Sequence, residues 1–171
     1  MNKHITKTRK IGIMAIFVAI GMVLQYAESR LIVTSVPGGK LGLANVVTII
    51  NIFMFGNKSA ILISVIRATL GCLISGGITA LPYSLSGAFF STLFMCLAKK
   101  LIYPRISTIG ISVIGAAIHN ISQIFVAALV FSSWYIFSYL PALLVVAVIS
   151  GVLTGYTADV FSKRILKEIY K

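Results

Sequence analysis

One arginine, Arg67, lies in the middle of the apolar stretch 61–74 and is the residue of this sequence best suited to act on a ligand. A guanidinium at membrane depth costs about 2.5–3.5 kcal/mol on insertion scales, so such a residue usually marks a functional site. Two roles are open for it. It contacts an anionic group of a ligand, or it forms a structural ion pair with Glu28, near the far end of the first apolar stretch.

Other polar side chains recur three or four residues apart within apolar stretches, and this spacing places them on one face of a helix. The stripes consist of Ala60, Ser64, Arg67, Gly71 and Ser75, of Asn45, Thr48 and Asn51, and of Ser112, Gly115, His119, Gln123 and Ala127, with Asn120 beside His119. Because polar side chains that face lipid lack partners, these faces are expected to turn toward one another or toward a cavity. The substrate-binding residues that we predict are Asn45, Asn51, Arg67, His119, Asn120 and Gln123. Hydrogen bonding between helices is the alternative role for the amides and the histidine.

Other kinds of site are not indicated by the sequence. Cys72 and Cys96 lack the spacing of metal ligands, and we interpret them as part of an apolar wall. The glycine-rich turn 37–42 lacks the Ser or Thr that follows Gly-Lys in a P-loop, because Leu41 follows Lys40. We therefore expect no metal site, no bound cofactor and no ATP hydrolysis by this chain.

The composition is that of a membrane protein. Of the 171 residues, 58% are hydrophobic and 11% are charged, which is too few charges to cover a soluble domain. The net charge of +12 comes from short basic clusters between apolar runs, which is typical of cytoplasmic loops and not of a nucleic-acid surface. We predict an all-α, single-domain, multi-pass protein of the cell membrane.

Six stretches are expected to form the transmembrane helices, although the second is short for a full crossing. They cover about residues 10–33, 41–55, 58–74, 79–98, 106–131 and 141–162. The first follows a basic start and resembles a signal peptide, but no small-residue cleavage site follows it, so we interpret it as an uncleaved span. The aromatic segment 134–139 suits a membrane–water interface.

The distribution of basic residues predicts the orientation. With the N-terminus in the cytoplasm, 12 of the 15 Lys and Arg residues fall on the cytoplasmic side, while Arg30 and Lys40 fall outside and Arg67 lies within the membrane. By the positive-inside rule both termini are expected to be cytoplasmic. At 1.5 Å per residue, Arg67 lies roughly 12 Å below the outer end of its helix. His119 and Gln123 lie at a similar depth, so we expect a pocket that opens to the outside.

Two pairs of small residues are spaced for close helix packing. Ala15 and Ala19 share one face of the first predicted helix, and Gly151 and Gly155 share one face of the last. Such pairs let the backbone of another helix approach closely.

The chain resembles a family of transporter subunits. Six spans, cytoplasmic termini and the Ala15-x-x-x-Ala19 motif are similar to the substrate-binding S-components of energy-coupling factor (ECF) transporters. Stretch 37–45 (PGGKLGLAN), Arg67, and stretch 115–120 (GAAIHN) with Gln123 more narrowly resemble the Gx transporter family, which is also described as heptaprenyl diphosphate synthase component I. The resemblance covers nearly the whole chain.

This resemblance implies partners and a substrate. The Ala15 and Ala19 face would dock on a separate transmembrane coupling subunit, which two cytoplasmic ATPases drive. The ligand pocket would lie in the outer half of the bilayer. We accordingly expect a non-enzymatic, substrate-binding membrane component for a small anionic or vitamin-like molecule, such as a flavin or an isoprenoid.

The synthase description makes a chemical demand that the sequence does not meet. Prenyl diphosphate synthases hold Mg²⁺ with aspartate-rich clusters, because the metal bridges carboxylates and diphosphate. This chain has three acidic residues, Glu28, Asp159 and Glu168, which are far apart. We expect no such catalysis by the chain alone. The alternative function is a non-catalytic membrane subunit or anchor that supports prenyl diphosphate or quinone metabolism.

Overall fold

The computed structural model describes residues 7–31, 42–74 and 77–169, and the side chains of all of these except 29–31 and 165–169. The described residues form helices and turns, with no strand among them. The helices are α1 (Lys7–Leu31), α2 (Asn45–Met54), α3 (Asn57–Ile74), the short 3-10 helix η1 (Ile78–Ala80), α4 (Leu81–Ile102), α5 (Thr108–Val130), the 3-10 helix η2 (Trp134–Tyr139) and α6 (Leu140–Ile169). The predicted all-α class is confirmed.

Five of the described helices, α1, α3, α4, α5 and α6, are long and apolar enough to cross a membrane. The chain is therefore a multi-pass membrane protein. Each of the six predicted stretches corresponds to one of the α-helices, with ends that differ by a few residues. The largest difference is at α6, which continues to Ile169 instead of ending near residue 162. The count of six crossings and the cytoplasmic position of the termini stay predictions.

Helix α2 is shorter than the predicted stretch 41–55. Its 10 residues have a length of about 15 Å, half of a hydrocarbon core that is about 30 Å thick. The helix begins only at Asn45 because the chain turns at Gly42, whose φ of +74° favours glycine. The rest of the glycine-rich turn, residues 37–41, lies outside the described residues.

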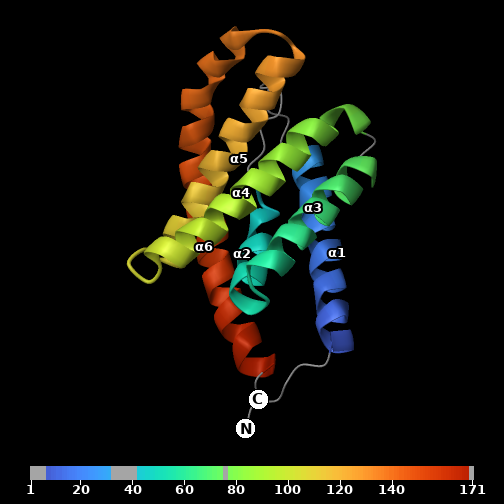
Figure 1. Ribbon diagram of the computed structural model, residues 1–171, viewed down its shortest axis with the longest axis vertical. Helices are drawn as coiled ribbons and strands as arrows, with labels where there is room; N and C mark the ends of the chain where they lie inside the picture. The colour runs from blue at the N-terminus through green and yellow to red at the C-terminus, as the bar shows by residue number, and fades with distance from the viewer. Residues whose placement is uncertain (1–6, 32–41, 75–76, 170–171) are drawn as a thin grey trace.

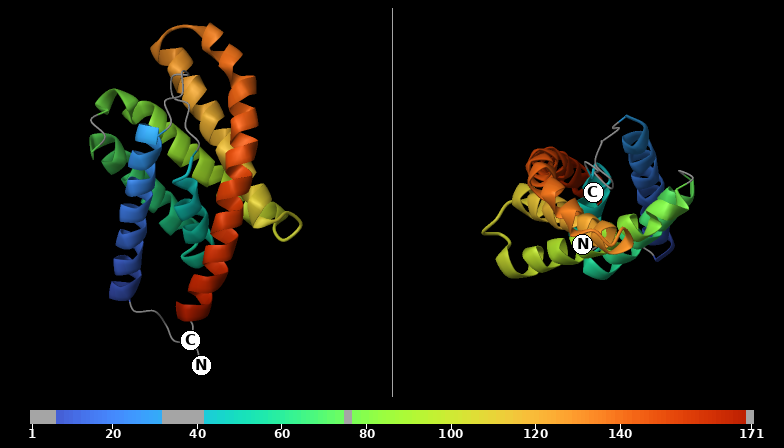
Figure 2. Two further views of the ribbon diagram at one scale, coloured as in Figure 1. Left: turned by 180° about the vertical axis from the view of Figure 1, so that it is seen from behind. Right: turned by 90° about the horizontal axis from the view of Figure 1, so that it is seen from above.

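The other helices surround α2 (Figures 1 and 2). Helix α2 packs on α3 and α6 and also contacts α1, α4 and α5. Its buried residues are Asn45, Val47, Thr48, Ile49, Ile50, Asn51 and Ile52. In Figure 1, α1 begins and α6 ends at the same end of the molecule. The predicted even number of crossings requires this arrangement.

Glycines bring α6 against α5. A Cβ at Gly151 would lie 2.7 Å from the Cα of Val113, and a Cβ at Gly155 would lie 2.7 Å from the Cα of Ile109. No side chain fits at such distances from a neighbouring backbone. The close approach that the spacing of these glycines predicts is confirmed.

Candidate functional site

The side chain of Arg67 lies inside the bundle, and only 3% of its surface is exposed. Its Nη1 donates a hydrogen bond of 2.9 Å to Oε1 of Gln25 on α1. Its aliphatic stem crosses α1 at Gly21, where a Cβ would collide with Cδ of the arginine. Its Nε has no hydrogen-bond partner in the part of the chain that the structure describes. The guanidinium is therefore held within the protein and keeps one donor available.

The carboxylate of Glu28 binds the turn that precedes α2. Its Oε1 accepts a hydrogen bond of 2.8 Å from the N–H of Gly42, and its Oε2 accepts one of 3.2 Å from the N–H of Leu43. The charge of Glu28 also acts on Arg67. Both carboxylate oxygens bond to the turn, and the ion pair of Arg67 with Glu28 stays a prediction. Because these hydrogen bonds are charge-assisted, they tie α1 firmly to the start of α2.

A small polar cavity lies beside these groups. Its lining consists of Gln25, Glu28, Gly42, Ala44, Asn45, Arg67, Ser84 and His119. Its volume of about 10 Å³ is the space of a single water molecule. We expected a pocket that is open to the outside and large enough for a ligand. The cavity found here is much smaller, because the polar side chains occupy most of the space, and its opening to the outside stays a prediction.

Two donors without partners belong to residues that line the cavity. One is the Nε of Arg67, and the other is the Nδ2 of Asn45, which also has no partner among the described residues. The Asn45 amide lies against Gly42, where a Cβ would be 2.8 Å from Nδ2. A buried donor without an acceptor costs about 1–3 kcal/mol. An anionic group, which offers only acceptors, would relieve both costs.

His119 and Gln123 pack against Gly87 of α4. A Cβ at this glycine would lie 2.9 Å from Nδ1 of His119 and 3.1 Å from Cγ of Gln123. His119 lines the polar cavity, whereas Gln123 is not part of the lining. Gln123 is 1% exposed, and neither polar atom of its amide has a partner within the described residues. Of these two residues on α5, only His119 reaches the cavity.

Asn51 and Asn120 also lie away from the cavity. The Nδ2 of Asn120 donates a hydrogen bond of 2.9 Å to the carbonyl of Leu143 on α6. The Nδ2 of Asn51 donates one of 2.8 Å to the carbonyl of Val47 in its own helix. Of the six predicted binding residues, the cavity therefore brings together Asn45, Arg67 and His119. A role of the other three in binding stays a prediction.

The sequence analysis missed several residues of the cavity. Gln25 and Ser84 were not among the candidates, and Glu28 was considered only as a partner of Arg67. A signal for Gln25 existed, because Gly21, Gln25 and Glu28 are spaced four and three residues apart and form a small polar stripe in an otherwise apolar helix. A comparable pattern also existed for Ser84, because Ser84, Gly87 and Ser91 are spaced three and four residues apart.

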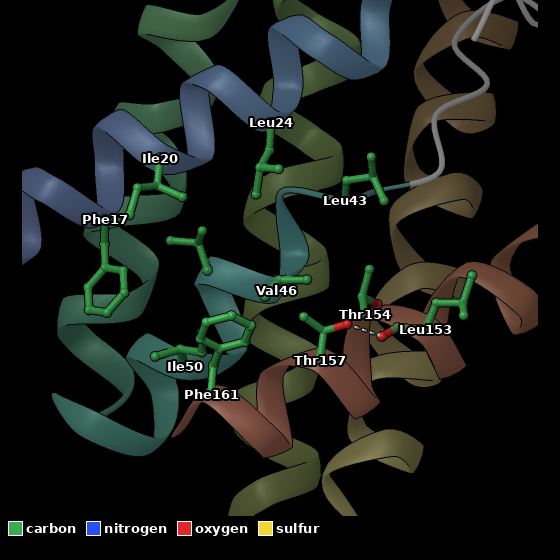
Figure 3. A pocket seen from close by; sticks show the side chains of 11 residues that line it. Phe17, Ile20, Leu24, Leu43, Val46, Ile50, Leu153, Thr154, Thr157 and Phe161 are labelled. Atoms are coloured by element: carbon green, nitrogen blue, oxygen red, sulfur yellow. Dashed lines mark hydrogen bonds between the residues drawn. The ribbon is translucent and has the colours of Figure 1, made fainter. Parts of the chain in front are cut away.

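A second, much larger hollow is lined by residues of α1, α2 and α6 and by Leu43 of the turn before α2 (Figure 3). This apolar groove has a volume of about 470 Å³ and lies between α1 and α6, with α2 as its floor. It is lined by Phe17, Ile20, Leu24, Leu43, Val46, Val47, Ile50, Leu153, Thr154, Thr157 and Phe161. In the described part of the chain α1 does not contact α6. The groove is therefore open along the gap between these two helices.

The described carboxylates do not form a metal site. Asp159 on α6 pairs with Lys163 at 2.6 Å and accepts a hydrogen bond of 3.2 Å from Thr108. Glu28 is on α1, at the polar cavity. Over residues 7–31, 42–74 and 77–169, no three His, Cys, Asp or Glu side chains are grouped so that they could hold a metal ion.

Comparison with known proteins identifies a family. The family model described as heptaprenyl diphosphate synthase component I matches residues 17–161. This range runs from α1 into the second half of α6 and includes every residue that lines the polar cavity and the apolar groove. No curated protein and no solved structure matches the chain.

Proposed function

The chain belongs to the heptaprenyl diphosphate synthase component I family, and on this basis we propose that it is a non-catalytic membrane subunit that binds a small anionic molecule for transport. It acts as the substrate-binding component of an ECF-type transporter. Arg67 and Asn45 contact the anionic group of the ligand, and His119 contacts its polar part. Asn51, Asn120 and Gln123 support these contacts from the neighbouring helices.

One observation carries this proposal: a buried arginine and a buried asparagine line the same cavity, and each has a donor without a partner. A purely structural arginine would be expected to use its donors within the protein, because unpaired donors in a membrane domain are costly. Charge-assisted hydrogen bonds to a carboxylate or phosphate would fill them.

The small volume of the cavity implies that a ligand enters by displacing part of the protein. The turn at residues 42–44 is the segment best placed to move, since Gly42 and Ala44 line the cavity and precede a short helix. The hydrogen bonds of Glu28 to Gly42 and Leu43 hold this turn closed. An incoming anion repels Glu28 and attracts Arg67, so it favours the open form.

The energy for transport comes from other subunits. The family description, component I, itself implies at least one partner subunit. Ala15 and Ala19 are exposed on α1, so this small-residue face is free to receive a helix of the transmembrane coupling subunit. Two cytoplasmic ATPases drive that subunit, and both termini of this chain lie on the same side as the ATPases.

A second candidate function follows from the family description. The chain anchors a soluble prenyl diphosphate synthase at the cell membrane and takes no part in transport. In both functions we propose that the chain is not the catalyst. Glu28 and Asp159 are on different helices and bond within the protein, so the described side chains offer no acidic cluster for Mg²⁺.

Affinity purification from mild detergent distinguishes the two functions. Recovery of a transmembrane protein together with two ATPases supports the transporter, whereas recovery of a prenyl diphosphate synthase alone supports the anchor. Mass spectrometry of small molecules that co-purify with the wild-type protein, but not with Arg67→Leu, identifies the ligand. The transport proposal fails if a folded Arg67→Leu protein retains the same small molecules as the wild type.

A further inference from the structure

The apolar groove between α1 and α6 has no part in the function proposed above. We propose that it holds the hydrocarbon chain of the same ligand whose anionic head binds at Arg67, so that the ligand is an amphipathic anion with a single chain. This inference rests on the proposed binding function and narrows its substrate class.

The chemistry of the groove admits only hydrocarbon. Nine of its eleven lining residues are apolar, and the two threonines already use their hydroxyl groups within the protein. The hydroxyl of Thr157 donates a hydrogen bond of 2.7 Å to the carbonyl of Leu153, as Figure 3 shows. The hydroxyl of Thr154 lies 2.8 Å from the hydroxyl of Ser112 and donates a hydrogen bond of 2.8 Å to the carbonyl of Ser150. A polar ligand would find no hydrogen-bonding group there.

The size of the groove fits one chain better than a protein helix. An engineered apolar cavity of about 150 Å³ holds benzene. The groove, at about 470 Å³, therefore has room for roughly 18 carbons on that scale. A helix of ten residues with its side chains is a cylinder about 10 Å wide and 15 Å long, or about 1,200 Å³. A partner helix could touch the rim of the groove but not fill it.

The groove also ends next to the polar cavity. Leu24 lines the groove and the adjacent Gln25 lines the cavity. Leu43 lines the groove, while Gly42 and Ala44 on either side of it line the cavity. The turn 42–44 is therefore the wall between an anion-binding space and a chain-sized apolar space. A ligand that displaces this turn connects the polar cavity with the apolar groove.

Membrane lipids supply the competing explanation, since any groove that faces a bilayer is filled by lipid chains. What distinguishes this groove is the pair of unpaired donors, Arg67 Nε and Asn45 Nδ2, at the cavity beside its end. Bulk lipid fills the groove without regard to those donors. A single-chain anion uses both spaces, and the opening between α1 and α6 lets its chain enter from the bilayer.

Binding of alkyl phosphates to the full chain tests this inference. The protein is placed in nanodiscs of phosphatidylcholine, and the binding of hexadecyl phosphate is compared with that of butyl phosphate and of hexadecanol. We expect hexadecyl phosphate to bind at least about tenfold more tightly than butyl phosphate, a ratio that corresponds to roughly two buried methylene groups. We expect a preference of at least about tenfold over hexadecanol as well, because hexadecanol has the same chain but no charge. If hexadecanol binds as tightly as hexadecyl phosphate, the groove is occupied as any lipid-facing groove would be, and the inference is overturned.

Paired tryptophan substitutions locate the chain. Ile20 lines the groove and is 45% exposed, whereas Ile16 is 60% exposed and does not line it. Ile20→Trp is expected to weaken the binding of hexadecyl phosphate about tenfold and to leave the binding of butyl phosphate unchanged. Ile16→Trp is expected to change the binding of neither compound. Should Ile20→Trp not fold, Leu153→Trp on the opposite wall serves in its place, with Ile149→Trp as its control.

The outcomes separate the inference from the function on which it rests. If Arg67→Leu abolishes binding of both phosphates but Ile20→Trp has no effect, the anion site stands and the chain site is wrong. If Arg67→Leu has no effect on either phosphate, the binding function itself is wrong. If Ile20→Trp instead prevents recovery of a membrane partner and leaves hexadecyl phosphate binding intact, the groove is a protein interface and the inference is overturned.

Discussion

The two hollows of this protein differ in almost every physical property, although they share α1, α2 and the turn between them. The polar cavity has a volume of about 10 Å³ and is mostly filled by its own side chains, whereas the apolar groove has a volume of about 470 Å³. Polar groups in a membrane domain draw together, because each one that lacks a partner is costly. Apolar walls have no such reason to close, since lipid chains fill the gap as well as protein does.

The difference suggests a division of tasks. In the proposed function the polar cavity recognises charge, because the charged side chains of Arg67 and Glu28 both line it. The groove has no unpaired polar group among its described lining residues and can select only by size and apolar area. Substitutions in the cavity should therefore have large effects on anion binding, and substitutions in the groove should affect the chain of a ligand alone.

The largest effect is expected from Arg67→Leu. It removes the only charged donor of the cavity's described lining and leaves Gln25 without its hydrogen bond. Hydrogen bonds to charged groups contribute about 1.5–3 kcal/mol each, so the affinity for hexadecyl phosphate should fall about 100-fold. Isothermal titration calorimetry in nanodiscs measures this loss. Arg67→Lys keeps the charge but not the planar donor geometry and should show an intermediate affinity. Unchanged affinity in both variants would place the anion site elsewhere.

A smaller effect is expected from Gly21→Ala on α1. The new Cβ collides with Cδ of Arg67, so either the arginine or the helix must shift. Overpacking of this kind costs about 1–3 kcal/mol of stability, and anion binding should weaken with it. The matched control is Gly12→Ala in the same helix, where no atom lies within 4 Å of the added Cβ. Thermal unfolding in detergent should show a loss for Gly21→Ala and none for Gly12→Ala. Equal behaviour of the two variants would contradict the described position of Arg67.

Glu28→Gln tests the wall between the two hollows. The variant keeps one acceptor for the turn but loses the charge that strengthens the bonds to Gly42 and Leu43. The turn should be destabilised by about 1 kcal/mol, and anion binding should become tighter because a repelling carboxylate is gone. Limited proteolysis of the turn and calorimetry with hexadecyl phosphate measure the two effects. Weaker anion binding in this variant would mean that Glu28 attracts the ligand, for example through a cationic group.

The smallest effect is expected in the groove, from Thr157→Val. The hydroxyl of Thr157 bonds only within its own helix, so its loss should change stability by less than about 0.5 kcal/mol. Binding of hexadecyl phosphate should be unchanged. Thr154→Val is the comparison, because the hydroxyl of Thr154 also bonds to Ser112 on α5. Its loss should lower the stability by about 1 kcal/mol. A large loss of binding in Thr157→Val would show that the groove recognises a polar group.

The predicted helices agree with the structure because their signals are local. Runs of apolar residues between basic clusters or glycines predicted six helices, and each is present. The exception is the start of α2, which the apolar run alone placed near residue 41. It begins at Asn45 because the chain turns at Gly42, and Glu28 on α1 binds that turn. That contact joins residues far apart in the sequence and left no local pattern.

The site was predicted in part for the same reason. Helical spacing correctly placed Asn45, Arg67 and His119 on inward faces, and the cavity unites them. Spacing did not indicate that Asn120 would bond to the carbonyl of Leu143, or Asn51 to that of Val47. An inward-facing amide bonds to whichever acceptor lies nearest, and only the packed helices determine which one that is.

The sequence by itself determined that this chain is a membrane protein. It also determined which residues form the helices, and that a positive charge is buried among these helices. These properties follow from the transfer of each segment from water to lipid, which depends on the residues of that segment alone. The tertiary structure decided which polar groups meet, that their cavity is small, and that a much larger apolar groove lies beside it. Those outcomes depend on partners from distant helices, whose hydrogen bonds and packing no single segment encodes.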